Sequence, residues 1–176
     1  LEEIVSFGMG IERFIDTRMN PILRARYSSN SVLCIGDPTG SVRVQTNEGS
    51  VFRSIRNKGY KLIGAPSNNL PPRLGAVEHF LTLLVNGKGG MLIDEKRCPM
   101  IISGFRGGYR FAKIRGGSAG GGFKDTPDKN DYSHIHDATQ YVALYAKQGH
   151  MLTSVDNPLN NSDIPPQIAY NPGCWS

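Results

Sequence analysis

Asp37 stands where a carboxylate can serve a binding site. It follows the short apolar run 31–35 and begins the sequence Asp-Pro-Thr-Gly. The apolar run predicts a buried strand, and the ligands of open α/β sheets gather beyond the carboxyl ends of strands. A carboxylate placed there can bind a divalent cation. The alternative role is structural, because Asp-Pro-x-Gly is also good turn chemistry.

Asp137 is the second candidate, at the start of the last predicted helix, 132–147. That helix is expected to bury one stripe, formed by Ile135, Ala138, Val142 and Tyr145. Asp137 lies off the stripe and is expected to face a cleft. His134 and His136 are two residues apart and cannot share one helical face, so this segment alone does not predict a zinc site. The alternative is that Asp137 only favours the dipole of the helix from its first turn.

Together the two aspartates favour a hard divalent cation. Carboxylate oxygens from separate elements suit Mg²⁺ or Mn²⁺ better than zinc. Phosphodiester cleavage with two metal ions needs several carboxylates, with the ions roughly 4 Å apart. Glu2 and Glu3 can be proposed as a third ligand, but exposed positions on a first edge strand explain both more simply.

Most of the positive charge lies in one stretch. Residues 88–129 hold nine Lys and Arg residues and four acids, an excess equal to the net charge of +5, and the remainder is neutral. A basic stretch set among glycines indicates a polyanion partner, usually nucleic acid, although a solvated surface without a partner is the alternative. The five glycines of 116–122 predict a flexible loop, either a flap over DNA or a plain hairpin connection.

The elements that must position these residues alternate along the chain. Strands are expected at 1–7, 31–35, 60–65, 91–93 and 108–114. Helices are expected from Gly10 to Leu23 with an interruption at Pro21, at 51–57, at 99–105 and at 132–147, and from Pro71 onwards with an apolar stripe that runs through Leu84 and Val85. This alternation predicts an α/β sandwich with a mixed or largely parallel sheet.

Length and composition favour one globular domain, 1–148, followed by an extended Pro- and Asn-rich tail, 149–176. No apolar run approaches the roughly 20 residues that span a bilayer, and no signal peptide is visible. Cys34, Cys98 and Cys174 are widely spaced and form neither a disulfide framework nor a metal-binding pair, which favours a reducing cytoplasm with Cys34 and Cys98 as buried thiols. A Rossmann-type cofactor enzyme is disfavoured, since the glycines of 116–122 do not join a buried strand to a helix.

Four stretches resemble the nuclease domain of phage terminase large subunits. Residues 36–46 (Gly-Asp-Pro-Thr-Gly-Ser-Val-Arg-Val-Gln-Thr) are similar to its Asp-Pro-Ala-Gly segment, and residues 73–77 to its Arg-x-x-Ala-Val helix start. Residues 92–111 resemble its Cys…Gly-Phe-x-Gly-Gly-Tyr block. Residues 129–141 resemble its Lys-Asn-x-Tyr-Ser-His-x-x-Asp-Ala-x-Gln-Tyr end. The stretches keep the order of the family.

The resemblance implies a ribonuclease-H-like fold, a mixed sheet flanked by helices, that cleaves concatemeric viral double-stranded DNA during genome packaging. Asp37 and Asp137 would hold Mg²⁺ or Mn²⁺ and serve catalysis. DNA phosphates would be held by Arg43, Arg73, Arg106, Arg110, Lys129 and His134. The implied partners are the terminase ATPase domain in the parent chain, the portal protein and the terminase small subunit, in the cytoplasm of an infected bacterium.

The resemblance also implies that a piece of the domain is missing. The first metal ligand of the family is an Asp on the first strand of the sheet, which would lie upstream of Leu1. Two other interpretations stay open: a non-catalytic DNA-binding or portal-docking module of the same fold, and another ribonuclease-H-like enzyme such as a transposase or junction resolvase. The Gly-Phe-x-Gly-Gly-Tyr block argues against the last.

Overall fold

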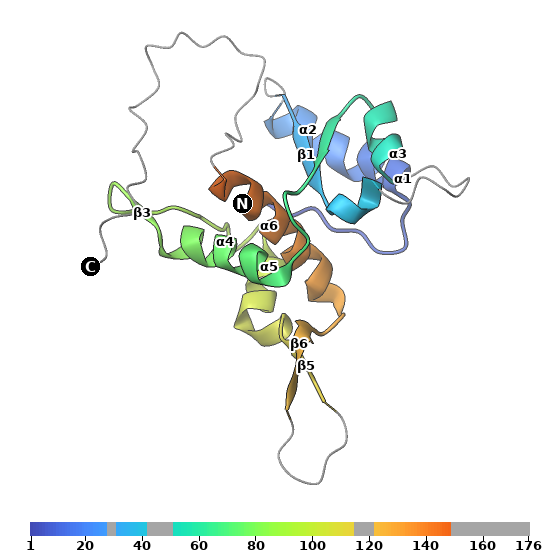
Figure 1. The fold of residues 1–176 in the computed structure, drawn as a ribbon. Coiled ribbons are helices and arrows are strands. Elements are labelled where there is room, and N and C mark those ends of the chain that lie inside the picture. The colour runs from blue at the N-terminus through green and yellow to red at the C-terminus, as the bar shows by residue number, and fades with distance from the viewer. Residues whose placement is uncertain (28–30, 42–50, 115–121, 149–176) are drawn as a thin grey trace.

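A computed structural model describes residues 1–27, 31–41, 51–114 and 122–148, and it combines helices with three small sheets (Figure 1). The helices are α1 (Ile11–Phe14), α2 (Asn20–Arg26), α3 (Val51–Asn57), α4 (Leu70–Thr82), α5 (Pro99–Ser103) and α6 (Asp131–Lys147). Three further helical turns are η1 (Ile15–Met19), η2 (Pro38–Ser41) and η3 (Gly104–Gly108). The strands are β1 (Leu33–Gly36), β2 (Lys61–Gly64), β3 (Leu84–Val85), β4 (Lys88–Gly89), β5 (Phe111–Lys113) and β6 (Phe123–Pro127).

The parallel pair β1–β2 carries the first candidate aspartate at its carboxyl end. Leu33 pairs with Lys61 and Gly36 with Gly64. α3 lies between the two strands in sequence and packs against β2. The strands expected at 31–35 and 60–65 and the helix expected at 51–57 are therefore confirmed. Each sheet among the described residues has two strands, so the larger mixed sheet of a ribonuclease-H-like fold stays a prediction.

Two expected strands are wrong. Residues 1–7 and 91–93 are not paired in a sheet. The first segment is held instead by the backbone N–H of Glu3, which donates to Arg97 O at 3.1 Å, and by the Glu3 carboxylate. That carboxylate accepts the N–H groups of Met100 and Ile101 at the start of α5. An alternating pattern forms a strand only when another strand lies beside it, and residues 1–7 instead contact the start of α5.

Pro21 does not break the first helix. It lies in the first turn of α2, where the missing N–H of proline is tolerated. The wider π-helical turn η1 directly precedes α2, and the helical path continues to Arg26. The expected interruption is therefore a change of helical pitch rather than an end.

The short hairpin β3–β4 contains Leu84 and Val85, which the helical pattern predicted as part of α4. α4 begins at Leu70 with Pro71 and Pro72 in its first turn, as expected, but it ends at Thr82. Asn86 and Gly87 have φ values of 51° and 74°. Two successive residues with positive φ make the type I′ turn that Asn-Gly favours in hairpins.

The core lies where α4 meets α6, and it does not follow the expected stripe. Ala76 and Val77 of α4 are buried against Ala143 and Leu144 of α6. The buried face of α6 is mostly polar or aromatic at its other positions, which are Ser133, His136, Gln140 and Tyr141.

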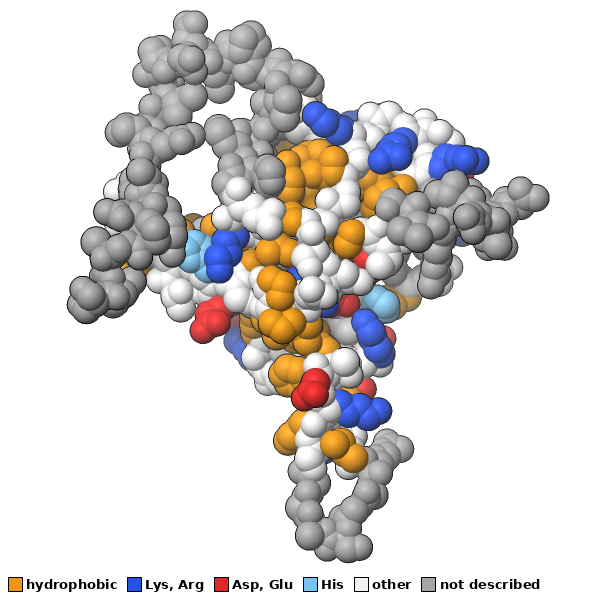
Figure 2. Space-filling view, in the orientation of Figure 1, with side chains coloured by type: hydrophobic (Ala, Val, Ile, Leu, Met, Phe, Trp, Pro, Cys, Tyr) orange, Lys and Arg blue, Asp and Glu red, His pale blue; other side chains and the backbone are white. Residues whose placement is uncertain are grey.

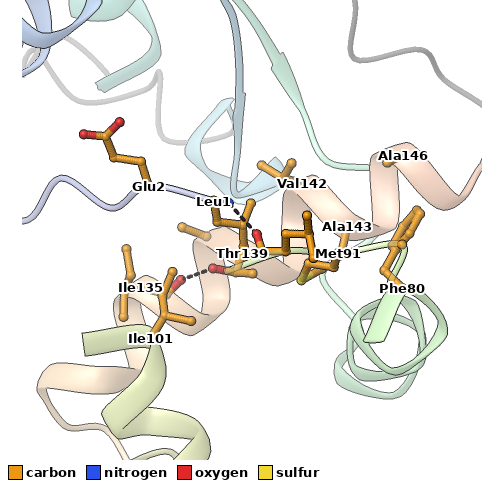
Figure 3. Close-up of a pocket in the computed structure, with 13 residues that line it drawn as sticks. Leu1, Glu2, Phe80, Met91, Ile101, Ile135, Thr139, Val142, Ala143 and Ala146 are labelled. Atoms are coloured by element: carbon orange, nitrogen blue, oxygen red, sulfur yellow. Dashed lines mark hydrogen bonds between the residues drawn. The ribbon is translucent and has the colours of Figure 1, made fainter. Parts of the chain in front are cut away.

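The predicted apolar stripe of α6 has a different role. Ile135 and Val142 are half-buried and, with Ala138, line an apolar groove of about 450 Å³. Figure 3 shows Ile135 and Val142 of α6 with Leu1 and Met91, which line the same groove. The stripe lines this open surface rather than the packed core because α4 and η3 contact other positions of the helix.

Cys98 is buried and Cys34 is half-buried in β1, and burial raises the pKa of both thiols. Both are free thiols; Cys98 is buried as expected, whereas Cys34 is only partly buried. Cys174 and the tail 149–176 lie outside the described residues. Within the described ranges, none of the helices has the length and apolarity needed to cross a membrane.

Candidate functional site

Asp37 is fixed by the turn that follows β1. Its Oδ1 accepts the backbone N–H and the hydroxyl of Thr39, both at 2.8 Å. The glycines on either side leave room for the ring of Phe52, since a Cβ at Gly36 or Gly40 would lie 3.0 or 2.7 Å from that ring. The turn alternative is thus realised, and it also holds the carboxylate at the end of a strand.

Asp137 lies on α6 between two cations. Its Oδ1 is 3.2 Å from a guanidinium nitrogen of Arg73 and its Oδ2 is 3.4 Å from Nζ of Lys129. The Arg73 side chain is 8% exposed, whereas that of Lys129 is 76% exposed. Arg73 is therefore a structural partner of Asp137, and Lys129 is free to meet a ligand from solvent.

Tyr141 connects the two aspartates. It follows Asp137 by one helical turn and is 6% exposed. The Arg73 guanidinium lies 4.8 Å above its ring. Its hydroxyl oxygen lies 2.6 Å from Asn68 Oδ1 and also within hydrogen-bond reach of Asp37, so the single hydroxyl proton has two possible acceptors. The structure thus brings Asp37 and Asp137, 100 positions apart in sequence, to the same Arg73–Tyr141 pair.

The pKa shifts agree with this arrangement. Burial alone would raise the pKa of Asp37, but the bonds from Thr39 and Tyr141 and the charge of Arg73 bring it below its ordinary value. Burial also raises the pKa of Tyr141 to about 12, with Arg73 opposing the shift and both aspartates adding to it. At neutral pH the site therefore contains a charged Asp37 beside a neutral tyrosine.

The two carboxylates suit one hard cation in the chemistry of their oxygen donors. Across the described residues there is no group of three or more His, Cys, Asp or Glu side chains that could hold a metal ion. Glu3 caps α5, and Glu2 pairs with Arg26 and Arg97, so neither supplies a third ligand beside Asp37 and Asp137.

No protein-family model, curated protein or solved structure matches the chain. The site therefore has to be interpreted from its own residues.

The glycine block before β5 consists of Gly104, Gly107 and Gly108, and it leaves the space, called here the seat, in which His136 of α6 packs. A Cβ on Gly104 would lie 1.9 Å from Nε2 of His136, so only glycine leaves space for this ring. His136 is 3% exposed, stacks on Tyr109 at 4.8 Å and meets the ring of Phe105 edge-on at 4.8 Å. Its Nε2 is 3.2 Å from the carbonyl oxygen of Ile101. This seat fixes the helix that carries Asp137.

The remaining predicted DNA contacts are spread over the surface. Arg106 on η3 is 73% exposed and pairs with Glu95 at 3.6 Å. Arg110 is exposed just before β5, and His134 is exposed in the first turn of α6. Arg43 and the segment 116–121 lie outside the described residues. Of the predicted phosphate contacts, the structure places Arg73 and Lys129 at Asp137.

Sequence reasoning missed Tyr141, Asn68 and the buried role of His136. Tyr141 had an available signal, because a residue four positions after Asp137 lies on the same helical face. Asn68 had none, since it comes from the segment between β2 and α4. For His136 the signal was the run of glycines at 104, 107 and 108, which leaves space for large rings.

His136 should make stability depend on pH. Burial lowers its pKa below the ordinary value of 6.5, so the folded state favours the neutral ring. This contribution is present above pH 6.5 and is lost as the pH falls toward the lower folded-state pKa, because the unfolded chain then binds the proton more readily. Thermal unfolding between pH 5 and 8 should show a steeper loss for the parent than for His136→Asn. Equal slopes for the parent and His136→Asn would contradict the prediction.

Proposed function

We propose that this chain is the nuclease domain of a viral DNA-packaging enzyme of the terminase large subunit type, with a ribonuclease-H-like fold. It would cleave concatemeric double-stranded DNA with Mg²⁺ or Mn²⁺. The observation that carries the proposal is the meeting of Asp37 and Asp137 at the Arg73–Tyr141 pair. Two acids from distant elements, held rigidly and backed by a buried cation, suit a hydrolytic metal site better than a turn and a helix start taken separately.

Asp37 and Asp137 would hold the cation. When bound, the ion supplies Lewis acidity toward a phosphate oxygen and lowers the pKa of a water molecule. Thr39 orients the Asp37 carboxylate through two hydrogen bonds to Oδ1. Arg73 holds Asp137 from the buried side and limits its rotation.

Lys129 beside Asp137, together with exposed basic side chains on other elements, would hold the DNA backbone. Lys129 lies 3.4 Å from Asp137 and can move to a phosphate without leaving a buried charge behind. His134, Arg106 and Arg110 are exposed on the elements that follow one another from η3 to α6. Contacts of this kind carry no base specificity and weaken as salt rises.

Conversion of supercoiled plasmid tests the proposal. This chain and a version extended upstream are incubated with Mn²⁺, with Mg²⁺ and with EDTA. Nicking in either metal that stops in EDTA supports a nuclease. If both folded chains bind DNA and neither cuts it, the nuclease assignment fails.

That second result would favour a non-catalytic DNA-binding or portal-docking module of the packaging motor. One observation supports this alternative: in the part of the chain that the structure describes, the site has two acids, and one of them already pairs with two cations. A module of this kind would keep its salt-sensitive DNA affinity when both aspartates are replaced.

A further inference from the structure

The antiparallel pair β5–β6 forms a ribbon that projects away from the helices (Figure 1). Phe111 pairs with Pro127 and Lys113 with Phe123. Cross-strand partners share a face of a sheet, as do alternate residues of one strand. The register shifts between these two pairs, but Phe111 and Lys113 alternate along β5 and Phe123 lies opposite Lys113, so the three side chains share one face of the ribbon.

The aromatic rings of this face are open to solvent. Phe111 is 42% exposed and Phe123 is 58% exposed. Large apolar side chains gathered on one projecting element mark an interaction surface more often than an accident of packing. In Figure 2 hydrophobic and basic side chains lie next to one another on this element.

The charges around the rings identify the partner. Arg110, Lys113, Lys124 and Lys129 outnumber Asp125 and Asp128 on the ribbon and its base. Arg110, Lys113, Phe123 and Lys124 also share the lining of one open hollow. Cations interleaved with aromatic rings suit a polymer that offers both phosphates and flat bases.

The exposed apolar hairpin β3–β4 provides the contrast. Its side chains Leu84 and Val85 are 71% and 47% exposed, but both are aliphatic and only Lys88 adds charge to its strands. It has no flat ring on which a base can stack. The combination on β5–β6 is therefore not a general property of the hairpins of this chain.

We infer that the β5–β6 ribbon binds single-stranded DNA, with unpaired bases stacking on Phe111 and Phe123 and phosphates held by Lys113, Lys124 and Arg110. In a duplex the base faces are already covered by their neighbours, so stacking on a phenylalanine ring first costs the free energy of unstacking a base, whereas a single strand offers open base faces. A ribbon lying in a major groove would instead read base edges through polar side chains.

The base of the ribbon adjoins the candidate site. The N–H of Asp128 donates to Arg110 O at 2.8 Å, and Lys129, the next residue, reaches Asp137. A strand held on the ribbon would thus enter beside Asp137. The inference shares with the proposed function only the premise that the chain binds DNA, and it requires no cleavage.

Fluorescence anisotropy in EDTA tests the ribbon apart from any nuclease activity. Labelled oligothymidylate and a matched duplex are titrated with the parent, with Phe111→Ala/Phe123→Ala and with the rescue variant Phe111→Tyr/Phe123→Tyr. The alanine variant should bind the single strand roughly 10- to 100-fold more weakly, while its duplex affinity changes less than about threefold. The tyrosine variant should bind the single strand as the parent does.

The control variant Leu84→Ala/Leu92→Ala truncates two exposed apolar side chains that lie outside the ribbon, each 71% exposed. It should leave both affinities unchanged. Parental single-strand affinity in the alanine variant, or an equal loss for duplex and single strand, would overturn the inference. Plasmid cleavage has no bearing on this result, so the two proposals can fail separately.

Discussion

Replacing Asp37 with Asn should abolish metal-dependent cleavage while leaving the fold intact. An asparagine keeps the Oδ1 that accepts from Thr39 at 2.8 Å, so the turn after β1 is preserved. It loses the negative charge that a divalent cation requires. Because removing even an outer partner of a metal ligand costs roughly 10- to 100-fold, loss of a ligand should lower plasmid nicking by about 100-fold or more.

Asp137→Asn should have the same effect on cleavage but a larger effect on the fold. The neutral amide removes the ion-pair partner of Arg73, whose side chain is 8% exposed, and leaves Asp37 as its remaining negative neighbour. Glu78→Gln on α4 is the matched control, because it removes an exposed carboxylate and should change nothing. Nicking rates are measured in Mn²⁺ together with melting temperatures. Parental nicking by Asp37→Asn at an unchanged melting temperature would remove Asp37 from the mechanism.

Two glycine-to-alanine substitutions should change stability in opposite directions. In Gly104→Ala the new Cβ would lie 1.9 Å from Nε2 of His136, so the ring must leave Tyr109 and Ile101. Displacing a buried ring in this way should cost roughly 2–4 kcal/mol in the free energy of unfolding. Gly75→Ala adds its Cβ in the middle of α4 with no atom within 4 Å. This variant should gain about 0.5–1 kcal/mol in the free energy of unfolding, because alanine has a higher helix propensity than glycine.

Thermal or urea unfolding measures both variants against the parent. At roughly 2–4 °C for each kcal/mol, Gly104→Ala should melt about 4–16 °C lower. Gly75→Ala should melt slightly higher. If Gly104→Ala is neutral, α6 does not depend on the seat formed by the glycine block, and the position of Asp137 needs another explanation.

Local patterns predicted the elements that carry the site. The apolar run before Asp37 and the periodic positions of 132–147 were sufficient for β1 and α6. The two aspartates could be singled out because a strand end and a helix start are natural places for them. Local patterns alone could not predict their proximity, which only the family resemblance implied, since it depends on Arg73 and Tyr141 from two different helices.

The errors have physical causes as well. An alternating pattern in 1–7 says nothing about whether a neighbouring strand is available. The helical stripe was extended through Leu84 and Val85 although Asn86-Gly87 is a hairpin turn signal. The apolar positions of α6 were predicted to face the core. The orientation of α6 is instead set by the packing of His136 in the seat, so polar side chains with specific partners face inward.

The join between the ribbon and α6 has a mechanical consequence. Asn130 accepts the N–H of Tyr132 as the cap of α6, and its Nδ2 donates to Gly108 O at 2.9 Å. Ribbon, η3 and the first turn of α6 are therefore clamped by one side chain. A strand pulled along the ribbon would pull on these two hydrogen bonds of Asn130. Asp137 lies about two turns further along α6. A displacement of the ribbon would therefore act first on the start of α6, the helix that carries Asp137.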